Sequence, residues 1–240
     1  MRLLQRSTRS LTLTEAGSEI LEEALRVTEA LASVETLSDE LQGQARGHLK
    51  VSCTTGIGKM HLVPLLAEFT QQYPNVRVQL FLEDRKADLI DEQMDVAIRM
   101  GDLPDSNQVA RRLGQATWVV VASPEYLAKH GTPTQPSDLL DHDCLYYRNN
   151  KSALKTWVFK SDKGEESITV DGRISVNESS SLVDAAELGM GILWVDNIVA
   201  SDAIEKGRLV PVLEDYSRGA GYPIYAIYPV RRHLSSKTRV

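Results

Sequence analysis

The stretch that decides the fold is residues 48–82, HLKVSCTTGIGKMHLVPLLAEFTQQYPNVRVQLFL. Its first six residues, HLKVSC, read as a buried strand. Residues 58–73 follow with apolar side chains at helical spacing, and Pro74 ends that helix. Residues 76–82 read as a second strand. The order strand, helix, strand favours a parallel sheet covered by helices.

The same alternation continues along the chain and predicts two similar α/β halves. A helix is expected over residues 87–94, and strands over 95–100, 109–113 and 117–123. After Ser123 a second set of short helices and strands begins, and residues 222–229 read as a strand that returns to the first sheet. Two crossings, near residues 122 and 222, predict a hinged fold that binds a ligand in the cleft at the carboxyl ends of its strands.

The start of the chain differs from this pattern. Residues 1–13 contain two short strand-like runs around a turn, with Arg6 and Arg9 near its tip. They predict a small basic ribbon, and the alternative is a frayed, solvated terminus.

Residues 14–42 read as one long amphipathic helix that begins at Thr14, a good N-cap. Its apolar residues repeat with heptad spacing. They are Ile20, Ala24, Val27, Leu31, Val34 and Leu41. We expect a dimer seam through Ile20, Val27, Leu31 and Val34, and the alternative is that the helix packs on its own domain.

Composition and charge exclude several classes of protein. The net charge of −6 argues against a body coated in basic charge for nucleic acid, although a small basic element on an acidic body remains compatible with it. No apolar run approaches the length of a membrane span, and no secretory signal is apparent. Cys53 and Cys144 form no CxxC pair, and a disulfide between them is not expected. We therefore expect a cytoplasmic protein with no membrane partner.

The sequence shows no constellation that would carry catalysis. It lacks GxSxG, P-loop and GxGxxG motifs, and its five histidines are scattered. Cys144 opens an apolar strand and is interpreted as a small core residue. No cofactor, no metal site and no enzymatic activity are expected.

Binding features are stronger. Thr54, Thr55 and Gly56 lie between a buried strand and a helix, and Ser179–Ser181 repeat this arrangement in the second half. Free N–H groups at two helix N-termini favour a small anionic ligand, although Thr55 is equally suited to capping its own helix. Further charged residues follow other strands and leave the sign of the pocket open. They are Arg99, Arg148, Glu83, Asp84 and Glu178.

Several motifs together resemble the LysR-type transcriptional regulators. The resemblance starts at LLQRSTRSLTLTEAG (residues 3–17) and continues through LVPLLAEFTQQYPNVRVQL, DLIDEQMDVAIRMGDLPDS, VVVASPEYLAKHGTP, GMGIL and GRLVPVL. It covers essentially all 240 residues. It implies an α/β, periplasmic-binding-protein-like effector-binding domain of two subdomains, preceded by a wing and a long linker helix. Residues 1–13 would then be the remnant of a DNA-binding wing, with Arg6, Thr8 and Arg9 against DNA, and residues 14–42 the dimerisation helix. Subdomain I would comprise residues 48–122 and 223–240, and subdomain II residues 123–222.

The resemblance also implies an effector site between the two subdomains. The positions carried over from the family follow the strands of both halves. Those after the third strand run from Arg99 to Gly101 and so include Met100. They are Thr54, Thr55, Gly56, Glu83, Asp84, Arg85, Arg99, Gly101, Tyr147, Arg148, Asn149, Asn177, Glu178 and Ser179.

The implied function is a dimeric or tetrameric regulator that binds promoter DNA in its full-length form and senses a small molecule. The family's helix-turn-helix precedes the wing, so residues 1–240 alone are expected to bind promoter DNA weakly. A stand-alone solute-binding protein is the alternative. The lack of a signal sequence and the heptad helix count against it.

Overall fold

The computed structural model describes residues 1–6, 11–42, 45–84, 94–103, 108–162, 164–216, 221–229 and 236–239. It forms two compact units. One comprises Met1–Leu49, Thr70–Val78 and Arg231–Val240, and the other comprises Lys50–Phe69 and Gln79–Val230. The predicted helix over 87–94 falls mostly outside the described residues.

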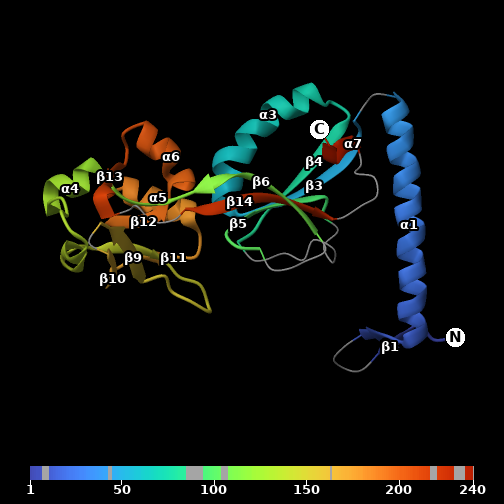
Figure 1. The fold of residues 1–240 in the computed structure, drawn as a ribbon, viewed down its shortest axis with the longest axis horizontal. Coiled ribbons are helices and arrows are strands. Elements are labelled where there is room, and N and C mark those ends of the chain that lie inside the picture. Colours follow the sequence, from blue (N-terminus) through green and yellow to red (C-terminus); the bar gives the residue numbers. More distant parts are fainter. Residues whose placement is uncertain are drawn as a thin grey trace. The chain divides into compact units, whose positions relative to one another are not determined.

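The N-terminal segment forms the predicted ribbon. Strands β1 (Leu4–Arg6) and β2 (Leu11–Leu13) pair antiparallel, and helix α1 (Glu15–Gln42) follows directly (Figure 1). The Thr14 hydroxyl accepts a hydrogen bond from the backbone N–H of Gly17 at 3.0 Å, which confirms Thr14 as the cap. A Cβ at position 17 would lie 2.0 Å from the Leu3 carbonyl oxygen, so only glycine fits there. The ribbon is therefore fixed to the first turn of α1.

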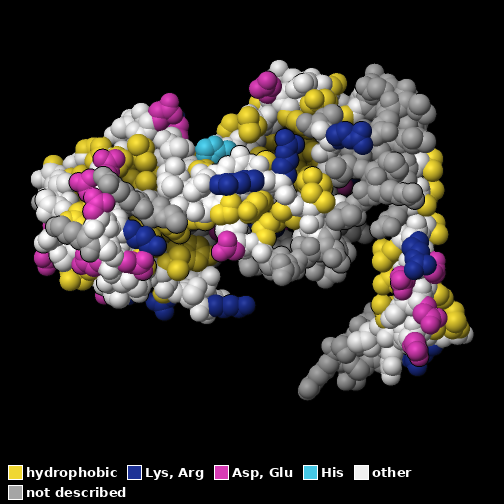
Figure 2. Space-filling view, in the orientation of Figure 1, with side chains coloured by type: hydrophobic (Ala, Val, Ile, Leu, Met, Phe, Trp, Pro, Cys, Tyr) yellow, Lys and Arg dark blue, Asp and Glu magenta, His cyan; other side chains and the backbone are white. Residues whose placement is uncertain are grey.

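Helix α1 exposes its apolar side chains. Ile20, Val27, Leu31 and Val34 are all exposed, with Val27 60% and Val34 66% exposed as whole residues. Figure 2 shows hydrophobic and acidic side chains side by side along this helix. The dimer seam stays a prediction.

The first sheet has the strand order β4-β3-β5-β14-β6. Its strands are β3 (Gly47–Cys53), β4 (Val76–Leu82), β5 (Val96–Met100), β6 (Gln108–Ala116) and β14 (Tyr222–Pro229). Between β3 and β4 the chain forms α2 (Thr55–Ile57), a π-helical turn (Gly58–Leu62) and α3 (Val63–Gln72). Strand β3 runs parallel to β5, whereas β14 runs antiparallel to both β5 and β6. The return of residues 222–229 to this sheet is confirmed. The predicted parallel pairing holds for β3 and β5, and the returning strand β14 makes the sheet mixed because it enters in the opposite direction.

The second sheet has the order β11-β8-β12-β7-β13 and is also mixed. Its strands are β7 (Trp118–Ala122), β8 (Cys144–Tyr147), β11 (Ser175–Val176), β12 (Ile192–Asp196) and β13 (Val210–Val212). Helices α4 (Pro124–His130), α5 (Ser179–Glu187) and α6 (Asn197–Glu205), together with the hairpin of β9 (Thr156–Ser161) and β10 (Gly164–Thr169), complete this part. A short helix, α7 (Ser236–Arg239), is the last element that the structure describes.

The pairing of strand β7 shows that the chain passes from the first sheet to the second earlier than predicted. Strand β7 pairs with β12 and β13, so it belongs to the second sheet although residues 117–122 were assigned to subdomain I. The chain therefore crosses between the sheets at Thr117 and not near residue 122. The backbone N–H of Thr117 donates to Asn197 Oδ1 at 2.9 Å, and the N–H of Asn197 donates to the Thr117 carbonyl at 2.8 Å. This reciprocal pair fixes the crossing to the start of α6.

The core of the second sheet lies on both of its faces. One face packs on the hairpin, whose Trp157 and Phe159 are almost fully buried, and the other packs on α5 and α6. Cys144 lies within the first of these clusters, which confirms its interpretation as a core residue. Burial raises the pKa of the Cys144 thiol to about 12 and that of Cys53 to about 11, so both thiols stay protonated and unreactive at neutral pH.

Candidate functional site

A cavity of about 480 Å³ lies at the carboxyl ends of strands from both sheets. All of its described lining residues belong to the larger compact unit. They are Thr54, Gly56, Asp84, Met100, Gly101, Trp118, Tyr146, Tyr147, Leu154, Trp157, Ser179, Leu182, Leu193, Trp194, Val195, Asp196, Val199 and Tyr222. A cavity of this size is within the range of small-molecule sites.

Aromatic rings form one wall of the cavity. Trp118 and Trp194 stack with ring centroids 4.3 Å apart and an interplanar angle of 23°. Tyr222 lies against Trp118 at 5.6 Å, and Trp157 lies against Trp194 at 6.0 Å. The chain has three tryptophans, and all three line this cavity. Such a wall offers flat apolar contact area and the negative faces of π-systems.

A buried carboxylate lies beside this wall. Asp196 is 4% exposed and caps α6, because its Oδ1 accepts a hydrogen bond from the Val199 N–H at 3.0 Å. It also accepts a hydrogen bond from the Tyr222 hydroxyl. Burial raises the pKa of Asp196, and burial together with the nearby carboxylate raises the pKa of Tyr222. Asp196 therefore holds Tyr222 in place on the cavity wall.

The first predicted anion site, after β3, already holds a carboxylate of the protein. The backbone N–H of Thr55 donates to Asp84 Oδ1 at 2.9 Å. Thr54 Oγ1 is buried, and the Cys53 thiol lies beside it. A Cβ on Gly56 would lie 2.7 Å from Val199 Cγ2, so the close contact between α2 and α6 requires glycine.

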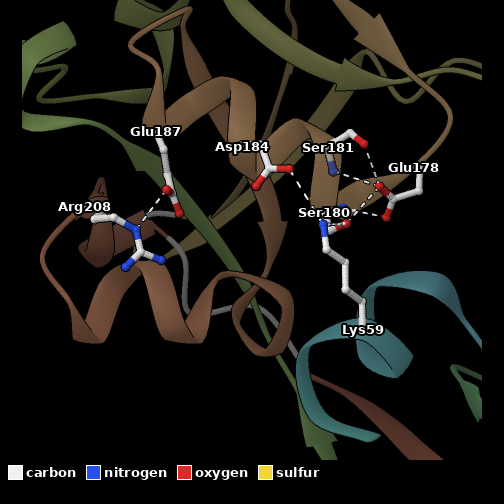
Figure 3. Close-up of polar contacts among 7 residues, drawn as sticks. All are labelled: Lys59, Glu178, Ser180, Ser181, Asp184, Glu187 and Arg208. Carbon is white, nitrogen blue, oxygen red and sulfur yellow. Dashed lines mark hydrogen bonds and ion pairs between the residues drawn. The ribbon is translucent and has the colours of Figure 1, made fainter. Parts of the chain in front are cut away.

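The second predicted anion site, at the N-terminus of α5, is likewise filled from within the chain. The carboxylate of Glu178 accepts hydrogen bonds from the backbone N–H groups of Ser180 and Ser181, each at 2.8 Å, and from both hydroxyls (Figure 3). Burial acts to raise the pKa of Glu178, but these hydrogen bonds outweigh it and the pKa lies below its usual value. The N-cap of α5 is Glu178 and not one of the serines that follow it.

Two polar side chains join the helical segment after β3 to the second sheet's helices. Lys59 Nζ donates to Ser180 Oγ at 3.3 Å and lies 3.8 Å from Asp184 Oδ2 (Figure 3). His61 Nε2 lies 2.9 Å from the Ile198 carbonyl oxygen. These contacts lie on the side of the cavity that is formed by helices. They connect the segment after β3 to α5 and α6.

The predicted site residues divide into two groups. Those that line the cavity are Thr54, Gly56, Asp84, Gly101, Tyr147 and Ser179, together with Met100 from the third predicted group. Those that do not line it are Thr55, Glu83, Arg99, Arg148, Asn149, Asn177 and Glu178.

The structure gives several of the second group other contacts. The Arg99 guanidinium donates to Ser52 Oγ at 2.7 Å, and Asn149 Oδ1 accepts from the backbone N–H groups of Lys151 and Ser152. Arg85, Thr8 and Arg9 lie outside the described residues, as does the side chain of Arg6.

The residues missed from the sequence are mostly apolar and aromatic. They are Trp118, Tyr146, Leu154, Trp157, Leu182, Leu193, Trp194, Val195, Asp196, Val199 and Tyr222. Most lie within strands that read as ordinary core. A usable signal was the concentration of all three tryptophans in the strands of the second half.

Among the residues that the structure describes, no group of His, Cys, Asp and Glu has the arrangement of a metal site. No helix in the same part of the chain is long and apolar enough to cross a membrane.

Comparison with known proteins identifies the family. The family model of the LysR substrate binding domain matches residues 42–240. The transcriptional regulator CrgA of Neisseria meningitidis is 31% identical over 238 residues, which is 99% of this chain and 79% of CrgA. The solved structure of CrgA superposes with a TM-score of 0.76, and the match covers 100% of this chain and 81% of CrgA. The full-length virulence activator AphB of Vibrio cholerae is 30% identical, with a TM-score of 0.71, and is covered to 81%. The chain belongs to the LysR-type transcriptional regulators, and most of it is their effector-binding regulatory domain.

Proposed function

We propose that the cavity between the two sheets is the effector site of this regulator, and that occupancy changes the arrangement of its two halves. The observation that carries the proposal is the composition of the lining. It draws on both sheets and concentrates the tryptophans of the chain on one wall.

The polar contacts across the helical side suggest how occupancy is transmitted. Lys59 from the first half meets Ser180 and Asp184 from the second. The side chains of Lys59 and Asp184 are 53% and 64% exposed, so this pair contributes at most about 1 kcal/mol and exchanges easily with water. A ligand that binds one arrangement of the halves better than another shifts the balance between them by its difference in affinity.

The proposal extends to partners. The exposed apolar residues of α1 would pair with a second copy in a homodimer, or in a homotetramer built from such dimers. Promoter DNA would be bound by the full-length regulator in the cytoplasm, with the ribbon of β1 and β2 as part of the contact. No catalytic role is assigned, and the relatives compared are regulators.

The effector site is tested by filling the cavity. Ser179→Phe places a ring into the lining, whereas Ser181→Phe, two residues along the same helix, places it on an exposed position outside the cavity. Compounds from a metabolite library that raise the melting temperature of the wild-type protein are then titrated into both variants by calorimetry. We expect Ser179→Phe to lose binding and Ser181→Phe to keep it. Equal affinity of a compound for the wild type and Ser179→Phe would place its site elsewhere.

A further inference from the structure

The lining of the cavity also indicates the chemical class of its ligand. We propose that this site takes a flat, aromatic compound that carries a positively charged amino group, with Asp84 as the counter-ion. The inference rests on the proposed function, because it concerns the ligand of the same cavity.

The apolar part of the ligand follows from the walls. Trp118 and Trp194 present a stacked pair, and Trp157 and Tyr222 extend the wall on either side. Aliphatic side chains of Leu154, Leu182 and Val199 complete it. Flat rings bind such walls with large contact area and low entropic cost.

The charge of the ligand follows from the polar lining. Asp84 and Asp196 are the ionisable carboxylates there, and none of the described lining residues is Lys, Arg or His. An anion would face these carboxylates in a site of reduced dielectric, where like charges repel, and a cation would be attracted to them and to the ring faces. The lining therefore favours a cation.

Three cationic side chains near the cavity, among the residues that the structure describes, have other partners. Lys59 contacts Ser180 and Asp184, Arg99 contacts Ser52, and Lys155 forms an ion pair with Asp171 at 2.6 Å. The two helix N-termini that would otherwise attract an anion already hold Asp84 and Glu178. An anionic effector would have to compete with a carboxylate of the protein at each of these two helix N-termini.

Asp84 is the better counter-ion of the two lining carboxylates. The interactions of Asp196 with Val199 and Tyr222 are internal to the chain, and its burial raises the cost of its charge. Asp84 is exposed, and its Oδ1 accepts from Thr55 while its Oδ2 accepts no hydrogen bond from a described residue. Thr54 Oγ1 is buried beside the Cys53 thiol, a weak hydrogen-bonding group, and lies in the same part of the lining as a further acceptor for the amino group.

The test uses three compounds that share one ring and differ in charge: 2-phenylethylamine, 2-phenylethanol and phenylacetate. Each is titrated by calorimetry into the wild type, into Asp84→Asn, and into Asp102→Asn as a control for an exposed carboxylate outside the cavity. Asparagine at 84 keeps an oxygen for the Thr55 N–H, so the loop is expected to keep its structure.

We expect the amine to bind the wild type roughly three- to tenfold more tightly than the alcohol, and the carboxylate more weakly than both. Asp84→Asn should remove the advantage of the amine and leave the alcohol unchanged, while Asp102→Asn should change neither. An amine whose affinity survives Asp84→Asn would overturn the role of Asp84. Tighter binding of phenylacetate, or binding of none of the three, would overturn the ligand class. The effector site itself is judged separately by the Ser179→Phe and Ser181→Phe pair.

Discussion

Replacing Asp196 tests the link between the cavity wall and the fold. In Asp196→Ala the N–H of Val199 loses the cap that accepts it at 3.0 Å, and the Tyr222 hydroxyl loses its partner. Loss of an N-cap costs about 0.5–2 kcal/mol, and loss of a partner for the half-buried Tyr222 hydroxyl costs less than the roughly 1–3 kcal/mol of a fully buried group. The desolvation of the buried charge, which raises the pKa of Asp196, is relieved at the same time and offsets part of this loss. We expect a net destabilisation of about 2 kcal/mol at neutral pH.

Asp196→Asn separates the charge from the geometry. The amide oxygen still accepts from Val199, and the amide nitrogen faces Tyr222, so its stability should lie within about 1 kcal/mol of the wild type. The pKa of Asp196 in the folded chain lies above the unfolded value of 3.8. The folded state therefore binds the proton more strongly. The stability that Asp196 contributes is complete below pH 3.8 and is lost as the pH rises through the raised pKa.

Urea unfolding followed by tryptophan emission measures both effects, since Trp194 and Trp118 lie on the same wall. Relative to the wild type, Asp196→Asn should gain stability as the pH rises from about 4 to 8. Unchanged stability of Asp196→Ala, or a difference between Asp196→Asn and the wild type that does not vary with pH, would refute the reasoning.

Three further predictions concern other parts of the chain. The double variant Val27→Glu and Leu31→Glu should be a monomer in light scattering, because it places charges on the exposed apolar stripe of α1. A dimer of unchanged mass would show that this stripe is not the dimer interface. Lys59→Met and Asp184→Asn should show a coupling energy below about 1 kcal/mol in a double-mutant cycle, since both side chains are more than half exposed; a larger value would mean that the contact is less hydrated than its exposure indicates. Hydrogen bonds from the Thr134 backbone N–H, from the Gln135 side chain and from the Thr134 hydroxyl hold the pKa of Asp138 at about 2, so the wild type should lose stability as the pH falls from about 3.8 to 2. Asp138→Asn should lack this loss when the urea midpoints are compared across that range, and an identical pH profile would contradict the assigned contacts.

The fold was largely predictable because local signals and periodicity agreed. The helix after Thr14, the strand–helix–strand unit of residues 48–82 and the return of residues 222–229 all follow from spacing and end signals. Strand β7 was assigned to the wrong sheet because an apolar strand carries no mark of its partners. Its pairing is decided by Thr117 and Asn197, which are 80 residues apart.

The site was predictable only in part. Thr54, Asp84 and Ser179 follow strands or begin helices, and topology alone brings such positions to the cleft. The aromatic wall was missed because Trp194 and Trp118 lie within strands, where a side chain that faces a cavity and one that faces the core give the same pattern. The capping role of Glu178 was missed because the serines beside it are the more usual caps.

The most direct test of the central claim is tryptophan emission during effector titration. All three tryptophans line the cavity, so a compound that binds there must change their environment. We predict a saturable change in emission whose midpoint equals the dissociation constant from calorimetry, and whose amplitude disappears in Ser179→Phe. A compound that binds the protein and regulates transcription while the emission of these tryptophans stays constant would contradict the account.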